Sequence, residues 1–129
     1  MSRVLFVCVQ NAGRSQIAEA LFIHAVDGRH EARSAGSAPA DRVYPAVAEL
    51  MPELAGRVPR GLEDADAEGA DVVVTMGCGD ACPYIPGKRY IDWDLPDPAG
   101  RPVDEVRTIR DEIGRRVNAL IRELDDHPL

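Results

Sequence analysis

Cys8-Val9-Gln10-Asn11-Ala12-Gly13-Arg14-Ser15 joins an apolar run at residues 4–7 to a helical pattern that begins near Ser15. A continuous apolar run of this kind is typical of a buried parallel strand. In the turn after such a strand, backbone N–H groups and the positive end of the helix dipole can surround an anion, and Arg14 can add two further hydrogen bonds. The stretch therefore predicts a loop over residues 9–15 that binds a tetrahedral oxyanion.

Cys8 stands at the end of that strand, within the positive field of the loop. A field that holds an anion also stabilises a thiolate, so we expect Cys8 to be ionised at neutral pH and to act as a nucleophile. Ser15 can donate a hydrogen bond to the Cys8 sulfur, cap the helix, or do both. Asn11 can brace the loop in a left-handed backbone conformation. Cysteine is often only a small buried hydrophobe, but the setting between a strand and a helix favours catalysis.

The length of 129 residues predicts a single domain over residues 1–129 with a core of its own. A net charge of −7 argues against binding to nucleic acid or to an anionic membrane. The N-terminal apolar run is too short for a signal peptide, and no stretch approaches the length of a transmembrane helix. We therefore expect a cytoplasmic protein, whose three cysteines are reduced and serve chemistry rather than structural disulfides.

Strand and helix patterns alternate along the chain, which predicts an α/β fold with right-handed crossovers and a parallel sheet covered on both faces. Strands are expected at residues 3–7, 31–35, 71–76 and 88–91, and helices at residues 15–28, 44–54 and 106–124. Ligands of such sheets bind at the carboxyl ends of the strands. Cys8 follows the first strand and Cys78 follows the third, so both can face one crevice.

Cys78 and Cys82 lie in an expected loop at residues 77–88 that is rich in glycine and proline. Their spacing is compatible with half of a metal site or with a redox pair. A structural zinc site would need four protein ligands. Cys8 is already assigned to the oxyanion loop, and the three histidines, His24, His30 and His127, do not have the spacing of zinc ligands. We therefore expect no metal and interpret the pair as a reversible disulfide.

Asp97 precedes Pro98 in a further expected loop at residues 92–102. An aspartate near a thiolate nucleophile is a natural proton donor to a departing oxygen. The alternative is that Asp97 only begins a turn, and Asp92 and Asp94 are competing candidates for the acid. Asp97 is the candidate general acid.

With these residues together, the chain resembles the low-molecular-weight protein tyrosine phosphatase superfamily, and more closely its bacterial arsenate reductases. The resemblance covers nearly the whole chain and is carried by residues 5–8, 11, 14–20, 34–36, 73–76 and 97–100. It implies a three-layer domain with a four-stranded parallel sheet flanked by helices, an oxyanion loop and an aspartate acid. The family's potassium ligands match at Asn11, Glu19 and Ser34, but Pro59-Arg60-Gly61 stands where an aspartate is expected.

Several departures from the phosphatase pattern favour a reductase. Gln16 stands where the phosphatases usually have proline, and residues 99–100 replace the aromatic residues that flank a phosphotyrosine ring. The resemblance then implies that Cys8 attacks arsenate, Cys78 releases arsenite as a Cys8–Cys78 disulfide forms, and Cys82 moves the disulfide outward for thioredoxin. Such an enzyme needs no tightly bound cofactor, and phosphate or sulfate would mimic its substrate.

Three alternatives stay open. The sequence around Cys78 and Cys82 resembles that of an actinobacterial branch of the family. Some members of this branch use mycothiol and mycoredoxin in place of an internal disulfide relay. The chain would then be an arsenate–mycothiol transferase that uses Cys8 alone. It could also be a phosphatase, because phosphate and arsenate are nearly isosteric, or a non-enzymatic arsenite or metal sensor, although it lacks a basic DNA-reading element. Monomer and homodimer are equally compatible with the sequence.

Overall fold

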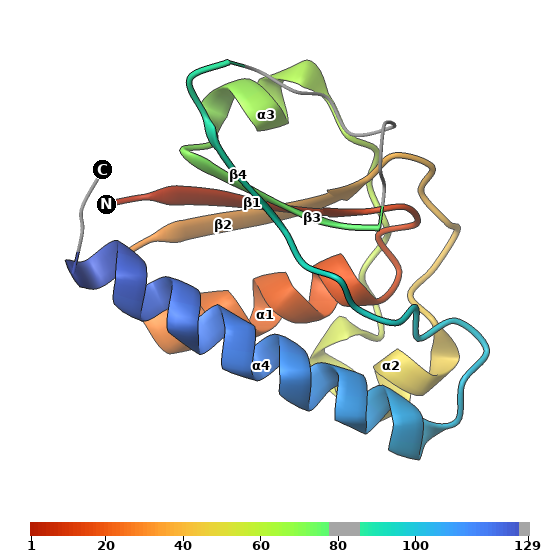
Figure 1. Ribbon diagram of the computed structural model, residues 1–129. Coiled ribbons are helices and arrows are strands. Elements are labelled where there is room, and N and C mark those ends of the chain that lie inside the picture. The colour runs from red at the N-terminus through yellow and green to blue at the C-terminus, as the bar shows by residue number, and fades with distance from the viewer. Residues whose placement is uncertain (78–85, 127–129) are drawn as a thin grey trace.

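The computed structural model describes residues 1–77 and 86–126, and its core is a sheet of four parallel strands in the order β2-β1-β3-β4 (Figure 1). The strands are β1 Arg3–Cys8, β2 Glu31–Gly36, β3 Val72–Met76 and β4 Arg89–Asp92. The helices are α1 Arg14–Val26, α2 Pro45–Leu50, α3 Asp64–Gly69 and α4 Val103–Asp126, with a 3₁₀ turn η1 at Pro52–Leu54. This confirms the α/β fold with a four-stranded parallel sheet that we expected from the sequence.

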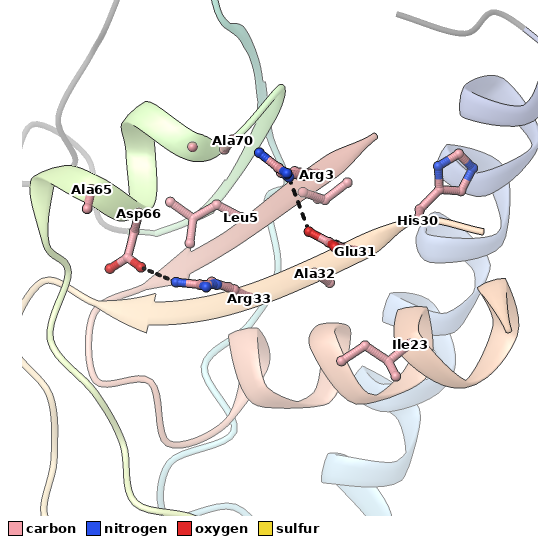
Figure 2. A pocket seen from close by; sticks show the side chains of 12 residues that line it. Arg3, Leu5, Ile23, His30, Glu31, Ala32, Arg33, Ala65, Asp66 and Ala70 are labelled. Carbon is pink, nitrogen blue, oxygen red and sulfur yellow. Dashed lines mark hydrogen bonds and ion pairs between the residues drawn. The ribbon is translucent and has the colours of Figure 1, made fainter. Parts of the chain in front are cut away.

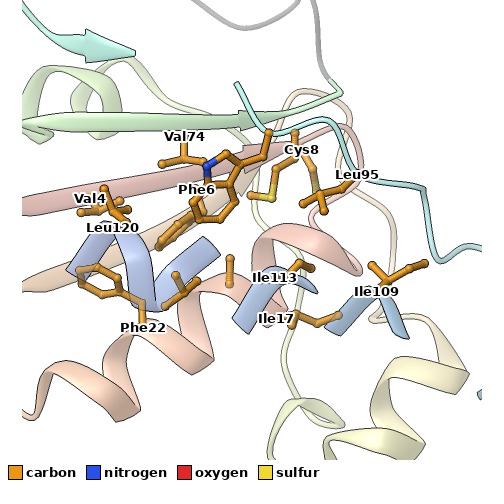
Figure 3. Packing of buried hydrophobic residues seen from close by; sticks show 14 of the residues in the cluster. Val4, Phe6, Cys8, Ile17, Phe22, Val74, Leu95, Ile109, Ile113 and Leu120 are labelled. Atoms are coloured by element: carbon orange, nitrogen blue, oxygen red, sulfur yellow. The ribbon is translucent and has the colours of Figure 1, made fainter. Parts of the chain in front are cut away.

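Alternate residues of β1 point to opposite layers, as the pleat of a strand requires. Val4, Phe6 and Cys8 belong to the larger cluster, which α1 and α4 cover, while Leu5 and Val7 belong to a smaller cluster beside α3. The Phe6 ring meets Phe22 of α1 edge-on at 5.7 Å between centroids (Figure 3). The pleat therefore places the Cys8 side chain on the face that carries α1.

The long helix α4 buries one apolar stripe at helical spacing against α1 and α2. Its buried residues are Val106, Ile109, Ile113, Val117, Leu120, Ile121 and Leu124. Figure 1 shows α1, α2 and α4 on one side of the sheet and α3 on the other. None of the helices among the described residues combines the length and apolar character needed to cross a bilayer.

Two expectations about helices need correction. The expected helix at residues 44–54 is broken after Leu50, because Pro52 has no N–H to donate and its ring clashes with the preceding turn. The helix α3 was not expected, because its six residues show no apolar period. A capping box stabilises it instead, in which the side chains of Glu63 and Asp66 each accept from the other's backbone N–H.

Asp66 also anchors the segment before α3, because its buried carboxylate accepts two hydrogen bonds from Arg60, at 2.9 and 3.0 Å. Burial opposes its ionisation, but the Glu63 N–H and the Arg60 guanidinium outweigh burial and hold the pKa of Asp66 below its ordinary value. A depressed folded-state pKa contributes stability above the unfolded pKa, and that stability is lost as the pH falls through the folded pKa.

We expect Asp66→Asn to lower the free energy of unfolding by about 2 kcal/mol at pH 7, because hydrogen bonds to a charged group are lost. The difference from the wild type should shrink as the pH falls below about 4, where the wild-type carboxylate is progressively protonated. Urea unfolding of both proteins, in steps from pH 7 down to pH 2.5, measures this. A difference that stays constant over that range would contradict the assignment.

Candidate active site

Cys8 ends β1 in the middle of the sheet, where it pairs in register with Gly36 of β2 and Met76 of β3. Only 2% of Cys8 is exposed, and it belongs to the same buried cluster as Leu95 (Figure 3). The following residues 9–13 form the expected loop, and α1 begins at Arg14. The nucleophile candidate therefore sits at the carboxyl end of a central strand, where parallel sheets bind ligands.

The backbone of the loop is oriented by the segment at residues 37–44. The carbonyl oxygens of Cys8, Val9, Gln10 and Ala12 accept from the N–H groups of Ser37, Ala38, Ala40 and Tyr44 at 2.8–3.1 Å. No described peptide bond is cis, and the N–H of a trans peptide points opposite to its carbonyl. The N–H groups of residues 9, 10, 11 and 13 therefore face the other, concave side of the loop, where they can bind an anion.

Gly36 lets the loop approach the end of β2 closely. A Cβ atom at Gly36 would lie 2.6 Å from the Val9 oxygen and 2.8 Å from the Asn11 nitrogen, both backbone atoms. No side chain fits at that distance, so the position requires glycine if the carbonyl of Val9 is to stay in place.

Ser15 is aimed at the Cys8 sulfur by Asn11. The Asn11 side-chain amide donates to Ser15 Oγ at 2.7 Å, and Ser15 Oγ lies 2.9 Å from Cys8 Sγ. Because the amide is the donor in the first bond, the Ser15 hydroxyl keeps its own hydrogen for the sulfur. Asn11 has the expected left-handed backbone, with φ of +50°. Ser15 is not the helix N-cap, since that position falls on Gly13.

Asn11 is itself held by two donors. Its side-chain oxygen accepts from Gln16 Nε2 at 3.1 Å and from the Arg60 N–H at 3.0 Å. These bonds fix which end of the amide faces Ser15 and thereby the direction of the bond toward the sulfur. A chain of buried and partly buried hydrogen bonds thus runs from α1 and residue 60 to the nucleophile.

Arg14 is buried and joins three parts of the site. Its Nη1 donates to the Leu95 carbonyl at 3.2 Å, and its Nη2 lies 3.8 Å from Asp97 Oδ2. Gly77, with φ of +88°, packs so closely that a Cβ there would lie 2.8 Å from Nη1. The arginine of the loop, the end of β3 and the loop after β4 therefore meet at one place.

Asp97 is the aspartate that reaches this place. Asp97 also begins a turn, because its Oδ1 accepts from the Ala99 N–H at 3.0 Å. Asp92, by contrast, accepts a hydrogen bond from Thr75 at 2.7 Å. Cys78 and Cys82 lie outside the described residues; Gly77, which packs against Arg14, directly precedes them in the chain.

Tyr44 belongs to the site but was not predicted from the sequence. It lies in no recognisable motif, and it directly precedes Pro45 at the start of α2. Its hydroxyl donates to Gln10 Oε1 at 2.7 Å. Burial, followed by the nearby negative charges of Asp97 and Cys8, raises the pKa of Tyr44 to about 12. The phenol is therefore neutral at physiological pH and serves as a hydrogen-bond donor at the rim of the loop.

Two arginines contact the side of the loop where the family resemblance placed potassium ligands. Arg57 lies 2.7 Å from the buried carboxylate of Glu19, and Arg60 donates to the Ser34 carbonyl at 3.0 Å. The Arg57 guanidinium already neutralises the Glu19 carboxylate, and the Arg60 guanidinium already binds the Ser34 carbonyl. This side of the loop therefore does not fit a bound monovalent cation. Among the described residues, no group of three or more His, Cys, Asp or Glu side chains could hold a metal ion.

A pocket of about 640 Å³ lies at the opposite, amino-terminal ends of β1 and β2, next to α3 (Figure 2). Its charged residues are paired with one another: Arg3 with Glu31 at 3.1 Å, and Arg33 with Asp66 at 3.7 Å. The lining residues that the structure describes include no cysteine or serine, and Cys8 lies at the far end of β1. The oxyanion loop, rather than this pocket, is the candidate active site.

Comparison with known proteins agrees with this geometry. The family described as "Low molecular weight phosphotyrosine protein phosphatase" matches residues 3–128. The "Glutaredoxin arsenate reductase" of Synechocystis is 32% identical over 131 residues, which cover 96% of this chain and 99% of that protein.

Two solved structures are also similar. A thioredoxin-dependent arsenate reductase of Corynebacterium glutamicum is 43% identical with a TM-score of 0.84, and the match covers 97% of this chain and 62% of that chain. This chain therefore spans less than two thirds of the Corynebacterium chain. An arsenate reductase of Archaeoglobus fulgidus is 35% identical with a TM-score of 0.78, over 92% of this chain and 98% of that chain.

Proposed function

Because the chain belongs to the low molecular weight phosphotyrosine protein phosphatase family, we propose that its oxyanion loop binds arsenate and that the protein reduces arsenate to arsenite. The observation that carries this proposal is the convergence of Cys8, Ser15, Arg14 and Asp97 on one loop. The arsenate reductases among its relatives support it. Gln16, the absence of aromatic residues at 99–100 and the two additional cysteines distinguish the chain from a phosphotyrosine phosphatase.

In the first step, the loop N–H groups and Arg14 bind arsenate, and the Cys8 thiolate attacks the arsenic. A sulfur–arsenic bond forms as one arsenic–oxygen bond breaks. Asp97, placed beside Arg14 at 3.8 Å, donates its proton to the departing oxygen, which leaves as water. The Ser15 hydroxyl stabilises the thiolate before the attack.

In the second step, the Cys78 thiolate attacks the Cys8 sulfur. The electron pair of the sulfur–arsenic bond goes to arsenic, so arsenic is reduced by two electrons and leaves as arsenite, while the two sulfurs are oxidised to a Cys8–Cys78 disulfide. Cys82 then attacks Cys78, frees Cys8 and leaves a Cys78–Cys82 disulfide. Only three residues separate these two cysteines, so closing the loop between them costs little entropy.

Thioredoxin is the reductant that we propose for the Cys78–Cys82 disulfide, in the cytoplasm. The Corynebacterium protein described as thioredoxin-dependent supports this choice. In the mycothiol alternative, the thiol of mycothiol would attack the arsenic on the enzyme, mycoredoxin would complete the reduction, and Cys78 and Cys82 would be idle. In the phosphatase alternative, a phosphotyrosine peptide would be turned over with a higher kcat/KM than arsenate.

We expect Cys82→Ser to permit about one turnover and then to stop, because the Cys8–Cys78 disulfide forms but cannot move to the surface. Quenched reactions with arsenate and thioredoxin, followed by peptide mapping, measure both the arsenite released and the disulfide trapped. Cys78→Ser is the matched control and should hold no Cys8–Cys78 disulfide. Normal cycling of Cys82→Ser with mycothiol and mycoredoxin would assign the protein to the transferase class.

A further inference from the structure

Gly13, the residue before Arg14, is covered by two side chains from distant parts of the chain. A Cβ atom at Gly13 would lie 2.6 Å from Pro98 Cγ and 3.1 Å from both Cδ2 and Cε2 of Tyr44. Real Cβ atoms do not approach other heavy atoms within 3.0 Å. The absence of a side chain at Gly13 therefore allows the rings of Tyr44 and Pro98 to rest together on the oxyanion loop.

Tyr44 is held in this position at both ends. Its backbone N–H donates to the Ala12 carbonyl at 2.9 Å, and its hydroxyl donates to Gln10 Oε1 at 2.7 Å. Both partners belong to the oxyanion loop. The phenol ring therefore moves with the loop, and it stands beside Pro98 over Gly13.

Asp97 depends on Pro98 for its place. The Asp97 side chain is 48% exposed, and its contact with Arg14 is long, at 3.8 Å. Its other bonds, from the Ala99 N–H to Oδ1 and from Arg101 Nε to the carbonyl, stay within its own loop. Pro98 is buried, and its close approach to Gly13, beside the Tyr44 ring, ties the Asp97 end of this loop to the oxyanion loop. Nearer to β4, the Leu95 carbonyl accepts from Arg14.

We propose that Tyr44 is a positioning residue, whose ring, with Gly13, seats Pro98 and so holds Asp97 over the Cys8–Arg14 loop. The proposal rests on the proposed function in that Asp97 is taken as the proton donor. A misplacement of about 1 Å can cost a catalytic group about a hundredfold. Substrate binding should change little, because the loop N–H groups and Arg14 remain.

Tyr44→Leu removes the ring and keeps an apolar side chain. We expect kcat for arsenate to fall about 10- to 100-fold while KM changes less than about threefold. Tyr44→Phe keeps the ring and loses only the bond to Gln10, so it should recover most of the kcat. Circular dichroism of both variants checks that they are folded. Equal losses in the two variants would overturn the proposal.

Two further measurements separate failure of this inference from failure of the proposed function. With aryl phosphates, Tyr44→Leu should slow phenyl phosphate, whose phenolate leaving group needs a proton, at least about tenfold more than p-nitrophenyl phosphate, whose leaving group needs little help. In hydrogen exchange, the Ala99 amide, which donates to Asp97, should lose protection in Tyr44→Leu and keep it in Tyr44→Phe. Equal slowing of both esters, or unchanged exchange at Ala99, would contradict the role of Tyr44 even if wild-type protein reduced no arsenate.

Discussion

Cys8→Ser is expected to lower arsenate-dependent turnover at least about a thousandfold, because it removes the nucleophile of the first step. The serine hydroxyl stays protonated at neutral pH, and oxygen cannot form the disulfide that reduces arsenic. The assay follows NADPH oxidation with thioredoxin and thioredoxin reductase. Cys8 is buried, Asn11 still donates to Ser15, and the loop carbonyls keep their partners, so the variant should still bind phosphate in a calorimetric titration. Turnover within about tenfold of the wild type would exclude Cys8 as the nucleophile.

Arg14→Lys should have the second-largest effect, a loss of about a hundredfold in kcat/KM for arsenate. A lysine has one compact ammonium group, so it cannot donate to Leu95, face Asp97 and bind an oxyanion through a planar fork at once. Arg115→Lys is the matched control, because Arg115 is exposed and pairs with Glu112 on α4. It should stay within about twofold of the wild type. If kcat/KM of Arg14→Lys for arsenate also stayed within about twofold of the wild type, the guanidinium would not bind the transition state.

The candidate site residues that lie close together in the sequence also lie together in the structure, as the local pattern predicts. Cys8, Asn11, Arg14 and Ser15 stand within eight residues, so strand, turn and helix start place them together without help from the rest of the chain. The sheet was predictable for a related reason, because apolar runs such as Val72–Met76 are short, β-branched and bounded by turns. Asp97 is predicted from its chemistry and its proline, and the fold brings it to Arg14.

The parts that the sequence did not reveal depend on contacts between distant elements. Tyr44 becomes part of the site only because Gly13 leaves room for its ring, and no local pattern announces that packing. Arg57 and Arg60 likewise meet Glu19 and Ser34 only after folding. The helix α3 was missed because capping bonds stabilise it in place of an apolar period.

One single-turnover experiment tests the central claim, that the Cys8 loop reduces arsenate with electrons from the chain's own thiols. Fully reduced protein, freed of external thiols, is mixed with arsenate; arsenite, free thiols and disulfide-linked peptides are then measured. We predict about one arsenite per chain, the loss of two thiols, and a Cys78–Cys82 disulfide. Wild-type protein that forms no arsenite and keeps all three thiols would contradict the claim.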